Sequence, residues 1–549
     1  MLRPHLRPEL RVLAGTLLLG LLIATLSAAQ PLLTRLLIDD GLIGRHYGSI
    51  VYACVGMLAL ASVGTLLGGW HRVIYVRASG RVLFSLRVVI YGHLQRVSPR
   101  RLAGIPTGDL VTRLDGDVAE VQRFGTDSAA TIVGGVLSLL VVGAVMLRLS
   151  WRLSLLVFAL MPLQLLVRHL ARQRIEQSTR DVREAAGGIS AFLIETLAGA
   201  RAVQGAAATD IEATRLGRLG DSYLVRVVRS QLVGYATGAG ASLLGSVSTA
   251  AVFLLGGWYV LSGELSVGTL VAYVAYLGRS AGSAASIVGL YTGYQRARVS
   301  LVRVGELFAL PVVPSDPDGA PIARDARGDL ELRGVTVRLA REQRDVLQGV
   351  DLAIPGGSKA VVGGASGTGK STLADLLRRF VDPDSGTVML DGRPLGAYRL
   401  DDVRRRIVVV EHSPVLFRGS LLDNLRYGFP DRDEQSVREV ARAAGIDEFI
   451  QSLPHGYATE IGEGGAGLST GQRQRIALAR ALIARPLVVI LDEATSGLDA
   501  PTARSIQHAV DTSFASCTRI VITHRAADIE RADMRLELDD GRLTHLAAG

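Results

Sequence analysis

The sequence predicts a multi-domain chain, in which an all-α transmembrane domain of six helices at residues 1–310 precedes an α/β domain at residues 329–549. Three observations lead to this fold class. The first part contains six apolar runs, each long enough to cross a bilayer. Four prolines within residues 311–328 indicate a linker. Beyond it, short β-branched runs alternate with helical patterns, which is typical of a soluble α/β domain.

Composition favours a membrane protein over a nucleic-acid-binding one. Of the 549 residues, 48% are hydrophobic, and the mean hydropathy of +0.31 is too apolar for an ordinary soluble enzyme. The pI near 9.8 is compatible with nucleic-acid binding, but the arginines concentrate in particular loops of the apolar half. The two cysteines predict neither a disulfide framework nor a metal site. We therefore expect the lipid bilayer as a partner and no nucleic acid.

The apolar runs follow one another through the first half of the chain. They lie near residues 11–29, 49–69, 128–147, 151–170, 234–261 and 266–290. The first run resembles a signal peptide, because Ser27-Ala28-Ala29 is similar to a cleavage site. A retained helix is favoured, since the apolar pattern continues to Ile38 and cleavage would leave an odd number of spans.

The distribution of arginine predicts the orientation in the membrane. Residues 168–229 carry ten arginines and residues 81–123 carry seven, whereas the short links between the other runs carry at most two each. By the positive-inside rule, both long segments and both chain termini are cytoplasmic. The expected protein is an integral protein of the bacterial inner membrane, with its α/β domain in the cytoplasm.

One arginine lies inside an apolar run. Arg279 falls about thirteen residues into the last run, which is deep for an ordinary loop charge. Arginines within a membrane tend to face a cavity or a carboxylate. The alternative is an arginine whose side chain extends to the interface from a shifted span.

A glycine-rich stretch in the second half predicts a phosphate-binding loop. Residues 364–371 (G-A-S-G-T-G-K-S) fit the pattern G-x-x-x-x-G-K-[ST], between a predicted strand at 359–363 and a predicted helix at 371–380. The glycines let backbone N–H groups surround a phosphate at the positive end of the helix. Lys370, one of only two lysines among 60 basic residues, would neutralise phosphate oxygens, and the Ser371 hydroxyl would bind Mg²⁺.

A second stretch predicts the acids of a nucleotide-hydrolysing site. Residues 487–491 form a predicted buried strand, and Asp492 and Glu493 follow it directly. The first acid would hold Mg²⁺, and the second would orient or deprotonate the attacking water. The pattern is weak alone, but it lies 122 residues after Lys370 and precedes A-T-S-G-L-D, which strengthens it.

With residues 468–472 (L-S-T-G-Q) opening a predicted helix, the chain resembles the ATP-binding-cassette superfamily, in which this signature is usually L-S-G-G-Q. Six spans ahead of one α/β P-loop NTPase cassette domain resemble a half-transporter of the exporter type. Residues 107–110 (T-G-D-L) and 195–199 (E-T-L-A-G) are similar to the segments that carry the family's coupling helices. The resemblance covers nearly the whole chain. It implies an ATP-hydrolysing transporter that exports a small peptide, lipid or drug-like substrate by alternating access as a dimer.

The resemblance also implies a role for each residue that matches a family motif. The ATP-contacting residues would be Gly364, Ala365, Ser366, Gly367, Thr368, Gly369, Lys370, Ser371, Thr372, Leu339, Ser469, Thr470, Gly471, Gln472 and Asp499. The catalytic residues would be Glu493 as base, with His524 and His412, and the Mg²⁺ ligands would be Ser371, Asp492 and His412. The signature would touch the γ-phosphate of an ATP bound on a partner subunit. His524, which follows a predicted strand, would contact the γ-phosphate of the ATP bound on its own subunit.

Three positions depart from the family pattern. Leu339 stands where the family places an aromatic ring under adenine, and Thr470 replaces the first signature glycine. His412 replaces a glutamine that touches Mg²⁺ and senses the membrane domain. These departures concern base affinity and coupling more than hydrolysis, because the phosphate loop, the acid and the base are all present.

Alternatives to this interpretation remain open at this stage. An importer of the siderophore type has the same architecture, and a membrane-anchored regulatory ATPase would transport nothing. A second copy of the chain is the simplest partner, because one chain supplies one phosphate loop and one signature that cannot close on the same ATP. A paired, different half-transporter is the other possibility. The sequence does not identify the substrate.

Overall fold

The computed structural model describes residues 7–546, apart from 314–318, 324, 340–343, 366, 497 and 524–531. It does not describe the side chains of 7, 129–130, 133, 161–172, 241, 284–289, 291–292, 339, 344 and 463. The chain divides into two compact units, one of Met1–Ile90 with Leu110–Glu306, the other of Tyr91–Asp109 with Leu307–Gly549. The second unit therefore contains the α/β domain together with a segment from the first half of the chain.

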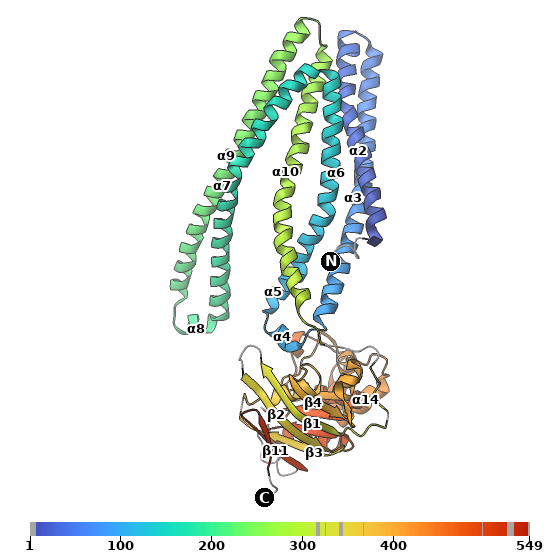
Figure 1. Ribbon diagram of the computed structural model, residues 1–549, viewed down its shortest axis with the longest axis vertical. Coiled ribbons are helices and arrows are strands. Elements are labelled where there is room, and N and C mark those ends of the chain that lie inside the picture. Colours follow the sequence, from blue (N-terminus) through green and yellow to red (C-terminus); the bar gives the residue numbers. More distant parts are fainter. Residues whose placement is uncertain are drawn as a thin grey trace. The chain divides into compact units, whose positions relative to one another are not determined.

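Six long helices make up the described part of the first unit (Figure 1). They are α2 (Leu10–Leu36), α3 (Tyr47–Leu94), α6 (Val118–Leu149), α7 (Trp151–Ala198), α9 (Thr209–Leu261) and α10 (Val267–Ala309). The first half of the chain also contains the short elements η1 (Arg7–Glu9), the π-helices η2 (Leu37–Ile43) and η3 (Arg113–Asp117), α5 (Thr107–Thr112) and α8 (Ala200–Gly205). A further short helix, α4 (Pro99–Ala103), belongs to the second unit. Each of the six predicted spans falls on one of the long helices.

The helices are longer than the bilayer requires. α7 has 48 residues and α9 has 53, so at about 1.5 Å per residue they extend about 72 and 80 Å, against a hydrocarbon core of about 30 Å. They pack along one another over much of this length (Figure 1). Within the described residues, Leu10–Ile43, Tyr47–Leu94 and Thr209–Leu261 are long and apolar enough to cross a membrane, and Gly134–Leu149 and Trp151–Leu160 are shorter apolar stretches.

Two sheets form the centre of the second unit. The larger has the order β12-β11-β3-β10-β9-β6, in which all neighbours are parallel except β12 and β11. Its strands are β3 (Lys359–Gly363), β6 (Ile407–Val410), β9 (Val488–Asp492), β10 (Thr518–Ile522), β11 (Met534–Asp539) and β12 (Arg542–His545). The smaller is antiparallel, with β2 (Arg344–Ile354), β1 (Leu330–Leu339), β4 (Ser385–Leu390) and β5 (Arg393–Pro394) in that order. A short pair joins β7 (Gly419–Ser420) to β8 (Glu460–Ile461).

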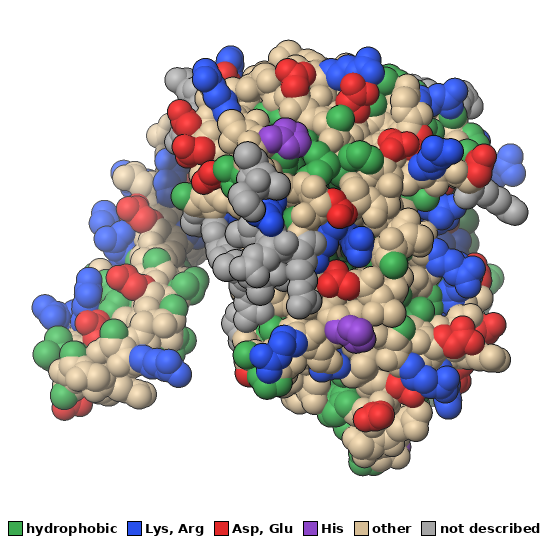
Figure 2. All heavy atoms as spheres, turned by 90° about the horizontal axis from the view of Figure 1, so that it is seen from below, with side chains coloured by type: hydrophobic (Ala, Val, Ile, Leu, Met, Phe, Trp, Pro, Cys, Tyr) green, Lys and Arg blue, Asp and Glu red, His purple; other side chains and the backbone are tan. Residues whose placement is uncertain are grey.

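Helices cover these sheets. In the described chain they are α11 (Lys370–Leu377), α12 (Leu400–Arg406), α13 (Leu421–Leu425), α14 (Glu434–Ala443), α15 (Asp447–Ser452), α16 (Thr470–Ile483) and α17 (Ala500–Ser513). Single 3-10 turns are η4 (Leu395–Ala397), η5 (Gly456–Ala458) and η6 (Glu463–Gly465). Basic and acidic side chains are interspersed over the surface seen in Figure 2, as expected for a domain in water.

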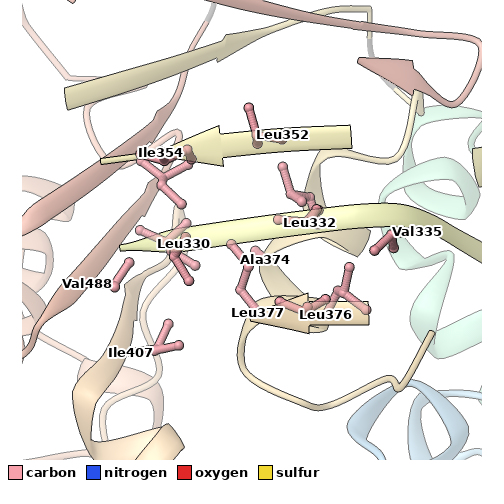
Figure 3. Close-up of a cluster of buried hydrophobic side chains, with 14 of the residues drawn as sticks. Leu330, Leu332, Val335, Leu352, Ile354, Ala374, Leu376, Leu377, Ile407 and Val488 are labelled. Atoms are coloured by element: carbon pink, nitrogen blue, oxygen red, sulfur yellow. The ribbon is translucent and has the colours of Figure 1, made fainter. Parts of the chain in front are cut away.

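A single buried cluster fixes the position of α11. Leu376 and Leu377 of this helix pack with Leu330 of β1, Ile354 of β2 and Val488 of β9 (Figure 3). All five side chains are at most 2% exposed, so the helix is held by residues of both sheets. Burying each such side chain contributes about 1.5–3 kcal/mol relative to leaving it in water. The turn that leads into α11 is therefore held at one edge of the parallel sheet.

Candidate functional site

The sheet order places two of the predicted motifs at the same edge. β3 leads into the phosphate loop, and β9 ends at Asp492. Both strands pair in parallel with β10, which lies between them. The carboxyl ends of parallel strands face the same side of a sheet, where ligands of α/β folds usually bind. His524 follows β10 in the sequence, but it lies outside the described residues, as does Ser366.

The phosphate loop has a backbone that only glycine accommodates at two positions. Gly364 has φ +132°, and a Cβ there would lie 2.3 Å from the carbonyl oxygen of Leu538. Gly369 has φ +108°, and a Cβ there would lie 2.7 Å from Val346 Cγ1. Real Cβ atoms do not approach other atoms so closely. These two glycines are therefore required by the fold of the loop, as well as by the close approach of a phosphate that the sequence predicts.

Lys370 is folded over the phosphate loop. Its Nζ donates to the carbonyl oxygens of Gly364, at 2.6 Å, and Ala365, at 2.8 Å. The side chain is 7% exposed, and Lys370 is the first residue of α11. Thr368 Oγ1 also donates to Ala365, at 2.9 Å. The ammonium group of Lys370 therefore lies at the N-terminal end of α11. The charge of this group and the positive end of the helix dipole both attract a phosphate.

Asp492 lies in a cavity of about 320 Å³ next to this loop. Seven polar residues line it, namely Ser371, Asp375, Arg378, Glu411, His412, Ser413 and Asp492. Burial raises the pKa of the Asp492 carboxyl, and the neighbouring carboxylates of Glu493 and Glu411 raise it further, while Lys370 and a hydrogen bond from Ser371 oppose them. The cavity therefore concentrates negative charge, which a cation would neutralise.

The donor set at Asp492 fits Mg²⁺. Among the described residues, no group of three His, Cys, Asp or Glu side chains is placed to hold a metal ion by itself. Mg²⁺ in nucleotide sites takes one or two protein ligands together with phosphate oxygens and water. The hydroxyl of Ser371 and the carboxylate of Asp492, which share a hydrogen bond, are ligands of this kind.

Glu493 is fixed by a rare backbone conformation. Its φ is +48°, its N–H donates to Ile522 of β10 at 3.0 Å, and its carbonyl oxygen accepts from the N–H of Ser496 at 2.9 Å. A non-glycine residue in this region costs about 1–3 kcal/mol and persists only where its surroundings hold it. Such residues are common at active sites.

His412 lies beside the turn that contains Glu493. Its Nδ1 is 3.0 Å from Ser496 Oγ and 3.4 Å from the carbonyl oxygen of Glu493. The buried Gln474 of α16 donates to the carbonyl oxygens of His412 and Glu411. Sequence reasoning missed Ser496 and Gln474, although both belong to stretches that it singled out. Ser496 lies three residues after Glu493, and Gln474 lies two residues after Gln472 of the signature. This closeness to the matched motifs is the sequence signal that could have identified them.

The signature residues begin α16, away from the phosphate loop. Ser469 Oγ accepts from Gln472 N–H at 3.2 Å, and Ser469 N–H donates to Gln472 Oε1 at 2.8 Å, which is a reciprocal capping box. Thr470 and Gly471 form the first turn, so the positive end of a 14-residue helix lies at the signature. α16 packs on α13, α14 and β6. Among the described residues, no hydrogen bond joins 469–472 to 364–372.

The remaining predicted residues lie at the ends of elements. Asp499 caps α17 by accepting from Thr502 N–H at 3.2 Å. Hydrogen bonding with Thr502 lowers the pKa of the Asp499 carboxyl. Leu339 is the last residue of β1 and pairs in register with Arg344, but its side chain is outside the described set. The position of Leu339 under adenine stays a prediction.

Replacing Asp492 with asparagine should stabilise the nucleotide-free protein. The folded state raises the pKa of Asp492, so ionising this carboxyl opposes folding. The opposition is complete above the raised pKa and disappears as the pH falls towards the usual aspartate range. We expect Asp492→Asn to raise the Tm of the metal-free protein more at about pH 8 than at about pH 5.

Thermal unfolding of the two proteins without nucleotide measures this effect. Glu460→Gln, which removes an exposed acid outside the cavity, should leave the Tm nearly unchanged at both pH values. A lower Tm for Asp492→Asn at the higher pH would contradict the prediction.

Comparisons with known proteins cover nearly the whole chain. The family model described as ABC transporter transmembrane region matches residues 13–280, and the one described as ABC transporter matches residues 347–496. A putative multidrug export ATP-binding/permease protein of Bacillus subtilis, YgaD, is 29% identical over 546 residues, which are 98% of this chain and 94% of the relative.

Two further matches agree with this one. An ATP-dependent lipid A-core flippase of Chromohalobacter salexigens is 32% identical over 490 residues, 89% of this chain and 84% of the relative. A solved structure of a bacterial Atm1-family ABC exporter with ATP bound has the same fold, with a TM-score of 0.80 and 24% identity over 98% of this chain and 94% of that one.

Proposed function

The chain belongs to the ABC transporter family as an exporter-type half-transporter, and we propose that two identical copies of it export an amphipathic substrate with an anionic group across the bacterial inner membrane. It is an integral membrane protein that binds ATP and couples its hydrolysis to transport. Half-transporters of this family act as dimers. The exporter interpretation stands, and the importer alternative does not.

The separation of the signature from the phosphate loop supports the proposed homodimer. Ser469 begins α16, whereas Lys370 begins α11 in a different part of the same domain. An ATP on the loop of one subunit would then be closed by the signature of the other. Two identical subunits can make two such sites with two-fold symmetry. A different half-transporter remains the competing partner.

The residues at the sheet edge have separate tasks in the proposed hydrolysis. Lys370 and the loop N–H groups would bind the phosphates, and Ser371 and Asp492 would hold Mg²⁺. The bound metal supplies charge that stabilises the transferring phosphoryl group. Glu493 would accept the proton of the attacking water. His412, through Ser496, would connect the turn of Glu493 with the segment that follows β6, and the contact with Mg²⁺ that the sequence predicts for it stays a proposal.

The charge inside the membrane domain supports the proposed substrate class. Arg279 of α10 is half-buried and donates to Ser27 Oγ of α2. Among the described residues, no carboxylate lies within 4.0 Å of its guanidinium. Nearby, Ser138 and Ser283 share a hydrogen bond of 3.1 Å. A guanidinium in an apolar span is costly without a counter-charge, which an anionic substrate group would provide.

Removing the charge at Arg279 should weaken transport of anionic amphiphiles. In proteoliposomes with the cassette outside, we expect ATP-dependent uptake of NBD-labelled lysophosphatidic acid, with KM raised about tenfold or more in Arg279→Gln. Arg279→Lys should retain most of the affinity, because it keeps the charge. The cationic dye rhodamine 123 should not lose affinity.

Arg35→Gln is the matched control, because Arg35 lies at the exposed end of α2, pairs with Asp39 and is 47% exposed. Unchanged KM for the anionic probe in Arg279→Gln would remove Arg279 from the substrate site. No ATP-dependent uptake of either probe by the parent protein would contradict the proposed substrate class itself.

A further inference from the structure

The segment Tyr91–Asp109 packs on the α/β domain as part of one compact unit. His93 Nε2 lies 3.2 Å from the carbonyl oxygen of Leu310, and the carbonyl oxygen of Arg96 accepts from the N–H of Val313 at 3.0 Å. Leu94 is 5% exposed and Leu307 is 1% exposed. These contacts hold the segment that precedes α4 against residues 307–313, which belong to the same compact unit as the phosphate loop.

Arg100 of α4 connects this segment with the helix behind the phosphate loop. Its Nε lies 2.9 Å from Asp375 Oδ2, and its Nη2 donates to Thr372 Oγ1 at 2.5 Å. Thr372 is 2% exposed, and the side chains of Arg100 and Asp375 are 29% and 27% exposed. The third nitrogen, Nη1, is buried and has no partner among the described residues. Both contacts are on α11, the helix that begins with Lys370 and Ser371.

The bond to Thr372 sets the direction of its hydroxyl. A hydroxyl has one proton to donate and two lone pairs that accept. Because a guanidinium can only donate, Thr372 Oγ1 must accept from Arg100. Its own proton is then free for another acceptor, and a nucleotide phosphate on this loop is such an acceptor.

The bond to Asp375 acts on the charge of the same cavity. Asp375 lines the cavity together with Asp492 and His412. Burial raises the pKa of the Asp375 carboxyl, and the nearby carboxylate of Asp492 raises it further. Arg100 opposes both effects and lowers this pKa. Withdrawing Arg100 would remove the ion pair of this carboxylate and leave Arg378 to offset its charge, beside the place where ATP and Mg²⁺ carry charge.

We propose that Arg100 is a positioning residue of the nucleotide site, which orients the Thr372 hydroxyl and neutralises Asp375, so that the position of α4 sets the affinity for ATP. Linkage makes the effect reciprocal, because ATP on the loop must then favour the packing of α4 that holds Arg100 in place. This route differs from the one through His412, since it reaches α11 directly. The inference rests on ATP binding at this loop.

The test measures binding of the slowly hydrolysed analogue ATPγS, with Mg²⁺, to the full-length protein by calorimetry. We expect Arg100→Ala to raise the Kd about fivefold or more. Arg100→Lys should be intermediate, because an ammonium can pair with Asp375 but does not reproduce the guanidinium fork. Arg101 is the matched control, since it is exposed on the same helix, and Arg101→Ala should bind within about twofold of the parent.

Two further readouts separate positioning from a general loss of structure. In steady-state hydrolysis, Arg100→Ala should raise the KM for ATP more than it lowers kcat. The double variant with Asp375→Asn should bind no more weakly than Arg100→Ala alone, because the two residues act as a pair. The Tm without nucleotide shows whether each variant folds, and Arg100→Lys replaces Arg100→Ala if the latter does not.

Each outcome decides the matter. The proposal is overturned if both Arg100 variants bind ATPγS with the parental Kd, or if Arg101→Ala raises the Kd as much as Arg100→Ala does. It is also overturned if the losses of affinity caused by Arg100→Ala and Asp375→Asn add up in the double variant. Failure of the parent protein to bind ATPγS would instead contradict ATP binding at the loop, on which the proposal rests.

Discussion

Glu493→Gln should abolish ATP hydrolysis while ATP remains bound. The carboxylate follows the strand that ends at Asp492, and its backbone is held by a hydrogen bond to Ile522 in a conformation that few residues adopt. Glutamine has nearly the same shape but cannot accept a proton. Removing a general base typically lowers the rate about 10²–10⁴-fold. ATP turnover and retention of bound ATP are the measurements, and closed dimers should accumulate because hydrolysis no longer opens them.

The acid at Glu411 provides a matched control for this variant. Glu411 lies in the same cavity and also raises the pKa of Asp492, but it follows β6 and not the strand that ends at Asp492. Glu411→Gln should therefore hydrolyse ATP within about threefold of the parent. If Glu493→Gln itself stays within that range, Glu493 is not the base.

Mixing two inactive variants should restore hydrolysis if the chain forms a homodimer. Lys370→Ala disables a phosphate loop, and Ser469→Arg disables a signature. In a mixed dimer, one composite site carries both lesions and the other carries neither. With random assembly, half of the dimers are mixed, so about a quarter of the parental activity should return if one intact site can turn over. ATPase activity of the co-expressed variants is the measurement.

The choice of signature variant matters because Ser469 also caps α16. Losing such a cap costs about 1 kcal/mol. Ser469→Asp keeps the cap and places a negative charge towards the phosphate, so it tests the same site with less structural damage. Two variants with the same lesion should stay inactive when mixed. A chain that is monomeric and inactive at every concentration would show that the partner is a different protein.

Local sequence patterns were sufficient to locate the elements that carry the site. The predicted strand at 359–363 matches β3, and the predicted strand at 487–491 matches β9 to within one residue. The six apolar runs all lie on long helices. These elements could be predicted because hydrophobic periodicity, glycine and capping residues act over a few neighbouring positions. The predicted helix that opens at the signature likewise matches α16, which begins at Thr470.

The sequence also determined the chemistry that the second half contains. An apolar strand that leads into residues 364–371 predicts a phosphate ligand, and two acids after another strand, 122 residues beyond Lys370, predict a Mg²⁺ site. The roles of Glu493, Asp499 and His524 remain predictions, since no ligand contact has tested them. The side chain of Leu339 and the whole of His524 lie outside the described residues.

Only the tertiary structure decided how distant segments meet at this site. Arg100 and Thr372 are 272 positions apart, and Ser496 and His412 are 84 positions apart, yet each pair is within hydrogen-bond distance. No periodic pattern contains such contacts, because they depend on how strands are ordered in the sheet and how one segment packs on another. The left-handed backbone of Glu493 has the same origin: its own residue type disfavours it, and hydrogen bonds with its neighbours impose it.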